Sequence, residues 1–142
     1  MSPPGDWGSA VFGNGNARVL IVEDSDMQRT KLADLVRLWG YDTETASDGL
    51  EALEKMPLFR PRVVISDLQM PRMAGVKLLE VLRSRVPGVD CIIVSGHAAL
   101  GETEAVTALG AIDYLEKPLD LERLRADLRR LAPGEGTGSP YK

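Results

Sequence analysis

Residues 62–67 read RVVISD, in which three β-branched residues at 63–65 precede a serine and an aspartate. Short apolar runs without alternation are typical of strands that are buried on both faces of a parallel sheet. Residues 18–22 (RVLIV) and 90–95 (DCIIVS) have the same character, and residues 42–46 and 111–115 are weaker β-rich stretches. The sequence therefore predicts strands at 18–22, 42–46, 62–66, 90–95 and 111–115.

Stretches with helical periodicity separate these runs. Ser25 and Gln28 have the spacing of a capping box, and Gly40 is placed to end the helix that follows them. Further helices are predicted over residues 48–56, 76–85, 102–109 and 121–131, with Pro57 ending the first of these and Asp120 capping the last. Alternating strands and helices favour an α/β doubly wound fold, in which helices cover both faces of a parallel sheet.

The composition is that of one ordinary globular domain with 142 residues and a net charge of −4. This charge gives no reason to expect direct binding to nucleic acid. One cysteine and one histidine argue against a disulfide and a structural zinc site. No membrane span or secretory signal is evident, so we expect a cytoplasmic protein. Residues 1–16 and 132–142 are rich in Gly, Pro and Ser, which predicts flexible tails, or a linker start, around a domain at 17–131.

Polar residues follow the predicted strands, where open α/β sheets bind their ligands. Glu23 and Asp24 follow the first strand, Asp67 the third, Ser95 ends the fourth, and Lys117 follows the fifth. Because clustered carboxylates repel one another, they need a cation, and an all-oxygen ligand set suits Mg²⁺. A lysine beside them can bind a phosphoryl oxygen. This pattern indicates phosphoryl chemistry at Asp67.

Four motifs lie at these strand ends: IVEDS at 21–25, SDLQMPRMAG at 66–75, IIVSGHA at 92–98 and DYLEKPL at 113–119. Together they resemble the signatures of response-regulator receiver domains, the phosphoacceptor half of bacterial two-component systems. The resemblance covers residues 17–131 and implies a flavodoxin-like (βα)5 receiver fold with a five-stranded parallel sheet. Residues 95–119 are most similar to receivers of nitrogen-regulation-type transcriptional activators, which implies a role in transcription regulation.

The resemblance also implies the roles of the acidic residues. Asp67 matches the aspartate that is phosphorylated. Glu23 and Asp24 match the acidic pair that holds Mg²⁺, with Asp24 as a direct ligand and Glu23 acting through water. The backbone carbonyl of Gln69 matches a further metal ligand.

The remaining motif residues match the groups that respond to phosphorylation. Ser95 and Lys117 match the hydroxyl and the ammonium that bind phosphoryl oxygens, and the bond before Pro118 is expected to be cis. Tyr114 matches the aromatic residue whose ring turns inward when the hydroxyl shifts. His97 and Gln69 occupy positions that tune the lifetime of the phosphorylated state, although His97 alone reads as an exposed loop residue.

For the whole domain, the resemblance implies a sensor histidine kinase or a phosphotransfer protein as the phosphodonor. It implies that the chain promotes its own phosphorylation and dephosphorylation and is not a turnover enzyme. The surface expected to change comprises the fourth helix, fifth strand and fifth helix, which is also a possible homodimer surface.

Other interpretations remain open from the sequence. Taken singly, Asp67 could be a helix cap and Lys117 an ordinary surface lysine, while Cys91 reads as an inert core residue. A pseudo-receiver that acts without phosphorylation is the main alternative. A dehalogenase-type phosphatase is disfavoured because the acceptor lies on the third strand, and a P-loop enzyme lacks its G-x-x-x-x-G-K-[ST] motif here.

Overall fold

The structure, a computed structural model, describes residues 17–70, 72–96 and 101–132. The predicted tail at residues 1–16, all of the predicted tail at 132–142 except Ala132, and His97 lie outside these residues. Ala132 is buried. The strands are β1 (Arg18–Val22), β2 (Asp42–Ala46), β3 (Val63–Asp67), β4 (Asp90–Ser95) and β5 (Asp113–Glu116). The helices are α1 (Asp26–Leu38), α2 (Gly49–Phe59), α3 (Gly75–Arg85), α4 (Glu102–Ala108) and α5 (Leu121–Leu131).

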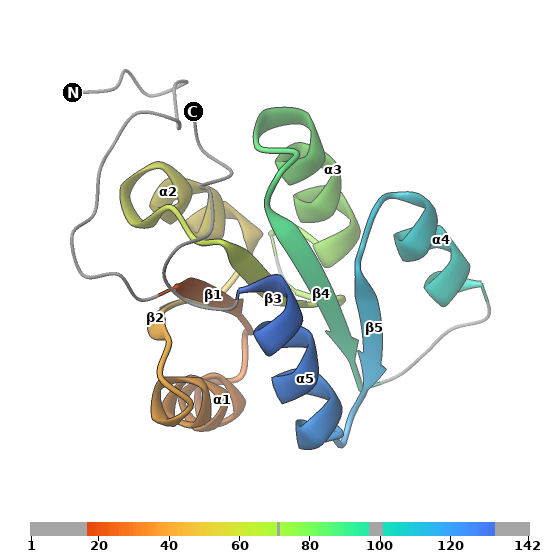
Figure 1. The fold of residues 1–142 in the computed structure, drawn as a ribbon. Helices are drawn as coiled ribbons and strands as arrows, with labels where there is room; N and C mark the ends of the chain where they lie inside the picture. The colour runs from red at the N-terminus through yellow and green to blue at the C-terminus, as the bar shows by residue number, and fades with distance from the viewer. Residues whose placement is uncertain (1–16, 71, 97–100, 133–142) are drawn as a thin grey trace.

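The strands form one parallel sheet in the order β2-β1-β3-β4-β5 (Figure 1). All pairings are parallel, and β3 lies between β1 and β4 with Ile65 opposite Ile21 on one side and Ile92 on the other. Every residue of β3 is buried, which fits the apolar run at its start, Val63 to Ile65. The predicted fold class, an α/β doubly wound five-stranded parallel sheet, is confirmed.

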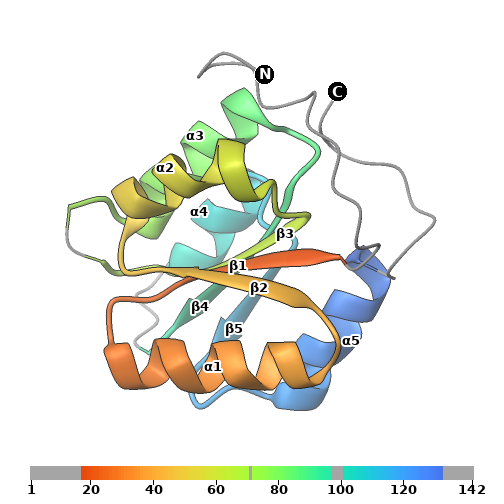
Figure 2. The same cartoon turned by 90° about the vertical axis from the view of Figure 1, so that its left-hand side faces the viewer.

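Helices cover both faces of the sheet, with α2, α3 and α4 on one side and α1 and α5 on the other (Figure 2). The alternation of side chains along each strand divides the core accordingly. Leu20 and Val64 pack with Met56, Leu78 and Leu82 on the first side. A second cluster fills the other side and includes Ile21, Ile65, Val36, Leu124 and Leu128.

Several predicted boundaries were wrong, all of them by one to three residues. Pro57 does not end α2, which continues to Phe59 and is capped by Arg60 in the left-handed conformation. A proline close to the end of a helix removes only one late hydrogen bond, so the chain can remain helical there. The third strand is Val63–Asp67 and the fifth is Asp113–Glu116, because strand ends depend on pairing with neighbouring strands. Helix α3 begins one residue early at Gly75, and α4 ends at Ala108.

Candidate functional site

Asp67 is the last residue of β3, at the carboxyl edge of the sheet, and is 7% exposed. The chain turns sharply after it, and the backbone N–H of Gly75 donates to the carbonyl of Leu68 at 2.9 Å. A Cβ atom at Gly75 would lie 2.5 Å from the carbonyl oxygen of Asp67. Only glycine fits this close approach, so the start of α3 packs directly against the end of β3.

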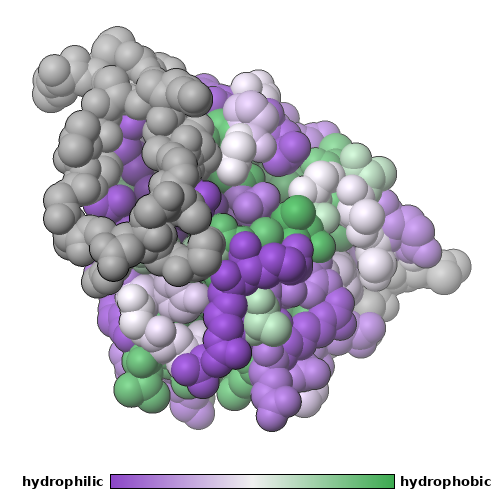
Figure 3. Space-filling model, in the orientation of Figure 1, coloured by the Kyte–Doolittle hydropathy of each residue, from purple (hydrophilic) through white to green (hydrophobic). Residues whose placement is uncertain are grey.

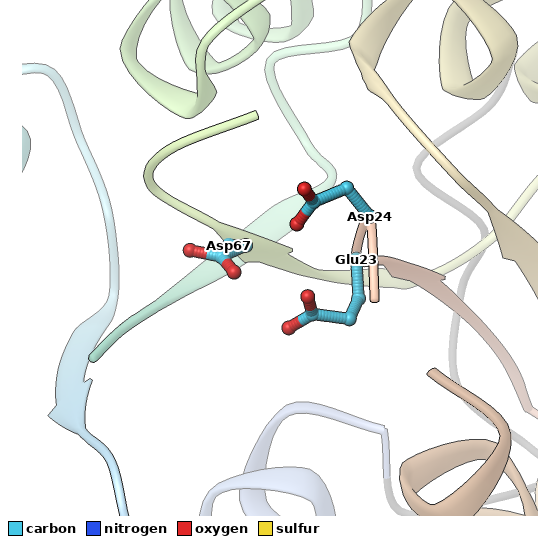
Figure 4. Close-up of side chains that lie close together, drawn as sticks. All are labelled: Glu23, Asp24 and Asp67. Carbon is cyan, nitrogen blue, oxygen red and sulfur yellow. The ribbon is translucent and has the colours of Figure 1, made fainter. Parts of the chain in front are cut away.

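Glu23 and Asp24 follow β1, the strand next to β3, and their side chains share the space in front of Asp67 (Figure 4). One carboxylate oxygen from each of Glu23, Asp24 and Asp67 lies within 4.8 Å of the other two. Glu23 is buried and Asp24 is exposed. The structure thus brings together the three carboxylates that the sequence placed on two different strands.

Lys117 follows β5 and reaches into this cluster. Its Nζ donates to Oε1 of Glu23 at 2.7 Å and to Oδ2 of Asp67 at 3.0 Å. The backbone N–H of Lys117 donates to the carbonyl of Ser95 at 2.8 Å, which attaches this segment to the end of β4. The Lys117–Pro118 peptide bond is cis, as predicted.

The charges in the cluster influence one another. Burial raises the pKa of Glu23, and the nearby charge of Asp67 adds to this effect, against opposing hydrogen bonds from Lys117 and Ser25. Burial opposes the charged form of Lys117, but its hydrogen bonds to Glu23 and Asp67 prevail and raise the pKa of this ammonium. Three carboxylates and one ammonium leave a formal charge of −2 at this edge. An oxygen-lined site of this charge fits a divalent cation such as Mg²⁺.

The other predicted site residues surround this cluster. Ser95 ends β4 and is almost fully buried. The backbone N–H of Gln69 donates to Oδ1 of Asp67 at 3.2 Å. Tyr114 lies on β5, opposite Ile93, and is 9% exposed. Its hydroxyl is buried without a hydrogen-bond partner within the part of the chain that the structure describes.

Gln28 has a different role from the one predicted. Its backbone N–H donates to the hydroxyl of Ser25 at 3.3 Å, so one half of the capping box forms. The side chain does not complete the box, since its Oε1 accepts a 2.7 Å hydrogen bond from Lys117, while the N–H of Ser25 donates to Glu23. Sequence reasoning missed Gln28 as a site residue because no local pattern connects it with a lysine 89 positions away.

A groove of about 620 Å³ opens beside Lys117, between α1 and the segment that follows β5. Its apolar lining comes from Leu32 and Leu35 of α1 together with Pro118, Leu119 and Leu121. Gln28, Lys31 and Lys117 line its polar side. The groove therefore joins an apolar surface to the charged cluster.

Cys91 is buried, which confirms the prediction of a core residue, and burial raises the pKa of its thiol to about 12. None of the helices that the structure describes is both long and apolar enough to span a bilayer.

Comparison with known proteins identifies the family of this chain. The family model of the response regulator receiver domain matches residues 19–129. Response regulator MprA of Mycobacterium sp. (strain KMS) is 38% identical over 127 residues, which is 87% of this chain and 55% of that protein. Response regulator MprA of Mycobacterium leprae is 36% identical over 126 residues, 86% of this chain and 55% of that protein. The chain thus spans about half the length of these relatives.

Solved structures show the same likeness. A response regulator receiver protein from Pseudomonas putida superposes with a TM-score of 0.77 at 29% identity, covering 81% of this chain and 97% of that one. Chemotaxis protein CheY4 of Vibrio cholerae has a TM-score of 0.75 at 33% identity, covering 82% of this chain and 98% of that one. With the family model matching most of its length, this chain belongs to the response regulator receiver domains of two-component systems.

Proposed function

We propose that Asp67 accepts a phosphoryl group from a phosphohistidine of a sensor histidine kinase or a phosphotransfer protein, in a cytoplasmic two-component pathway. The observation that carries this proposal is the Lys117 ammonium, which lies 3.0 Å from Asp67 and 2.7 Å from Glu23 within the carboxylate cluster. This arrangement places a fixed positive charge beside a carboxylate at the accessible edge of the sheet. Positioning and charge neutralisation are the main contributions to phosphoryl transfer.

The donor set supports a bound Mg²⁺. Its ligands would be the carboxylates of Glu23, Asp24 and Asp67, with Glu23 acting through water, and the backbone carbonyl of Gln69. The proximity of the three carboxylate oxygens, within 4.8 Å of one another, fits an ion that prefers oxygen ligands. When bound, Mg²⁺ would neutralise part of the negative charge on the transferred group.

In the proposed transfer, one bond to phosphorus forms as another breaks. A carboxylate oxygen of Asp67 forms a new P–O bond while the P–N bond of the phosphohistidine breaks, and its electron pair returns to the imidazole nitrogen. Lys117 and the hydroxyl of Ser95 donate hydrogen bonds to the phosphoryl oxygens. Water later hydrolyses the acyl phosphate in line. The chain is therefore a reactant that promotes its own modification, and not a turnover enzyme.

The proposed output is a change on the face formed by α4, β5 and α5. Ser95 ends β4, and Tyr114 lies on the neighbouring β5, so movement of the serine hydroxyl toward a phosphoryl group can affect the tyrosine ring. Since Tyr114 is already buried in this structure, phosphorylation would stabilise a buried ring position that the resting protein also populates. This face would then contact an output partner or a second copy of the chain.

The exposed edge of the sheet and the neighbouring groove indicate where a phosphodonor would approach Asp67. The donor must reach Asp67 across the edge of the sheet where Asp24 and Gln69 are exposed. The neighbouring groove offers an apolar contact surface, and Leu121 at its rim is 45% exposed. A role in transcription regulation, which the resemblance to nitrogen-regulation-type activators implies, is part of this proposal.

Phosphorylation by acetyl phosphate with Mg²⁺ tests the proposal. We expect intact-protein mass spectrometry to detect one added phosphoryl group on the natural chain and none on Asp67→Asn, whose circular dichroism should be unchanged. The asparagine keeps the size of the side chain but removes the nucleophilic carboxylate. An unmodified natural chain, with no spectroscopic response to beryllofluoride and Mg²⁺, would favour a pseudo-receiver that works through contacts alone.

A further inference from the structure

The ammonium of Lys117 has a third acceptor in addition to the two carboxylates. An ammonium group carries three N–H donors. Here they meet Oε1 of Glu23 at 2.7 Å, Oδ2 of Asp67 at 3.0 Å and Oε1 of Gln28 at 2.7 Å. Within residues 17–70, 72–96 and 101–132, Gln28 is the one neutral side chain that binds this ammonium. All three donors are thus occupied before any phosphoryl group arrives.

Gln28 is held in place by the first turn of α1. Its backbone N–H is capped by Ser25, whose own N–H donates to Oε2 of Glu23 at 3.0 Å. The adjacent Arg29 donates from Nη1 to the backbone carbonyl of Glu23 at 2.9 Å. These contacts attach the start of α1 to the end of β1, so the amide of Gln28 approaches Lys117 from a fixed position.

The three bonds differ in strength. All three have an ionised donor, but only the bonds to Glu23 and Asp67 also have an ionised acceptor, which adds the Coulomb attraction of opposite charges. Glu23 and Asp67 are buried carboxylates, whereas Gln28 is neutral and exposed. The bond from Lys117 to Gln28 is therefore the one that an anionic oxygen can most readily replace.

We propose that Gln28 is a positioning residue that holds the third N–H of Lys117 in the resting protein and releases it to a phosphoryl oxygen. This inference rests on the proposed function and concerns the control of its rate. With acetyl phosphate, the P–O bond to acetate breaks, acetate leaves with the electron pair, and a P–O bond to an Asp67 carboxylate oxygen forms. Gln28 does not contact the reacting atoms and acts only through Lys117.

Replacing the amide by a carboxylate of the same shape tests this role. In Gln28→Glu the third acceptor becomes anionic, so it should hold Lys117 against the phosphoryl group. We expect the rate constant for Asp67 phosphorylation by acetyl phosphate, at saturating Mg²⁺, to fall by roughly fivefold or more. Gln28→Leu, which has no acceptor, should react at least as fast as the natural chain.

Thr30→Glu is the matched control. It adds the same charge to the same helix at an exposed position, but it is two residues away and thus on a different face of α1. Its rate constant should stay within about twofold of the natural value, since a distant exposed charge is screened. Equal rates for Gln28→Glu and Thr30→Glu would overturn the proposal.

A second measurement needs neither metal nor phosphodonor. The NMR signal of the Lys117 side-chain methylene next to Nζ, observed in the metal-free protein, should shift in Gln28→Leu and in the shorter Gln28→Asn, but not in Thr30→Glu. An unchanged signal in both Gln28 variants would refute the contact. If the natural chain is never phosphorylated, the proposed function fails, and this signal still decides whether Gln28 holds Lys117.

Discussion

At the scale of single residues, Lys117 and a metal ion would neutralise the same carboxylates. Its ammonium contacts Glu23 and Asp67, two of the three residues whose carboxylates form the oxygen cluster. A cation at this distance lowers the attraction of the cluster for a second cation. We therefore expect the lysine to weaken metal binding in the resting protein, whereas in the proposed function its charge assists phosphoryl transfer.

We expect Lys117→Ala to bind Mg²⁺ more tightly, with a dissociation constant roughly 3- to 10-fold lower, because a competing positive charge is removed. Isothermal titration calorimetry measures this change directly. Lys31→Ala is the control. Lys31 lines the same groove, so this substitution removes an equal charge, but among the described residues Lys31 makes no contact with the carboxylate cluster. Equal affinities for the two variants would contradict the explanation.

The same variant should separate phosphorylation from the structural response. Without the ammonium, a phosphoryl group on Asp67 has no link to the segment that follows β5. Phosphorylation should then leave hydrogen exchange in α5 unchanged in Lys117→Ala, whereas we expect it to alter this exchange in the natural chain. A normal response of α5 in the variant would show that the signal travels by another route.

At the scale of elements, the connection from β3 to α3 determines where Asp67 lies. Gly75 begins α3 directly beneath the carbonyl of Asp67, and an added Cβ would lie 2.5 Å from this oxygen and 2.9 Å from the Cα of Leu68. Both neighbours are backbone atoms of the central strand and of the residue after it, so they cannot move independently of the site.

We expect Gly75→Ala to lower the free energy of unfolding by about 1–3 kcal/mol, as overpacking against backbone does elsewhere. It should also slow phosphorylation of Asp67, because relief of the clash displaces the acceptor. Urea denaturation measures the first effect. Gly96→Ala is the matched control, since its Cβ would meet only the Lys117 side chain at an ordinary 3.7 Å. Equal stability of the two variants would rule out the close approach as the constraint.

The elements also show what a sequence can predict. Strands β1, β2 and β4 were predicted with the bounds they have, because burial on both faces or flanking turns define such short runs locally. The end of α2 was wrong because proline disfavours helix only through a few nearby atoms, and packing of Met56 and Phe59 against the core prevails.

In the candidate site, too, local sequence predicts some residues, whereas others depend on tertiary packing. Glu23, Asp24, Asp67 and Lys117 were predicted as neighbours, because parallel strands place their carboxyl ends at one edge. Gln28 was not, since a side chain that can cap its own helix gives no sign that it will turn to a distant lysine. Contacts of this kind depend on tertiary geometry and not on spacing.

At the scale of the whole molecule, an ion pair links the fifth strand to the fifth helix. Arg123 binds Asp113 at the start of β5, and Arg130 binds Asp127 at 3.0 Å within α5. Much of the outer surface in this view, including that of α5, is hydrophilic (Figure 3). Asp127, in contrast, is 7% exposed, and its Oδ2 has no hydrogen-bond partner among the described residues.

The pKa values of Asp113 and Asp127 are shifted in opposite directions. Burial, followed by the interaction with Asp113, raises the pKa of Asp127 to about 6. Burial also opposes the charged form of Asp113, but its interactions with Asp127 and Arg123 prevail and lower its pKa. The proximity of Asp113 thus favours the protonated form of Asp127.

The raised pKa of Asp127 makes the stability of the fold depend on pH. Between the unfolded pKa of 3.8 and the folded value of about 6, the folded chain holds a proton that the unfolded chain has lost. The free energy of unfolding must therefore fall as the pH rises through this window. Above the window, the whole of this loss is present. Asp113, whose pKa is lowered, contributes in the opposite sense only below its unfolded value.

Asp127→Asn should remove this dependence, because the amide is neutral at every pH and can donate to Asp113. At pH 8 we expect the variant to exceed the natural chain in free energy of unfolding by on the order of 1 kcal/mol, with the difference shrinking toward pH 5. Urea denaturation across this range measures it, and Glu122→Gln, which removes an exposed charge from the same helix, should show no such trend. A difference that stays constant from pH 5 to 8 would mean that Asp127 acts through packing and the bond to Arg130, and not through its proton.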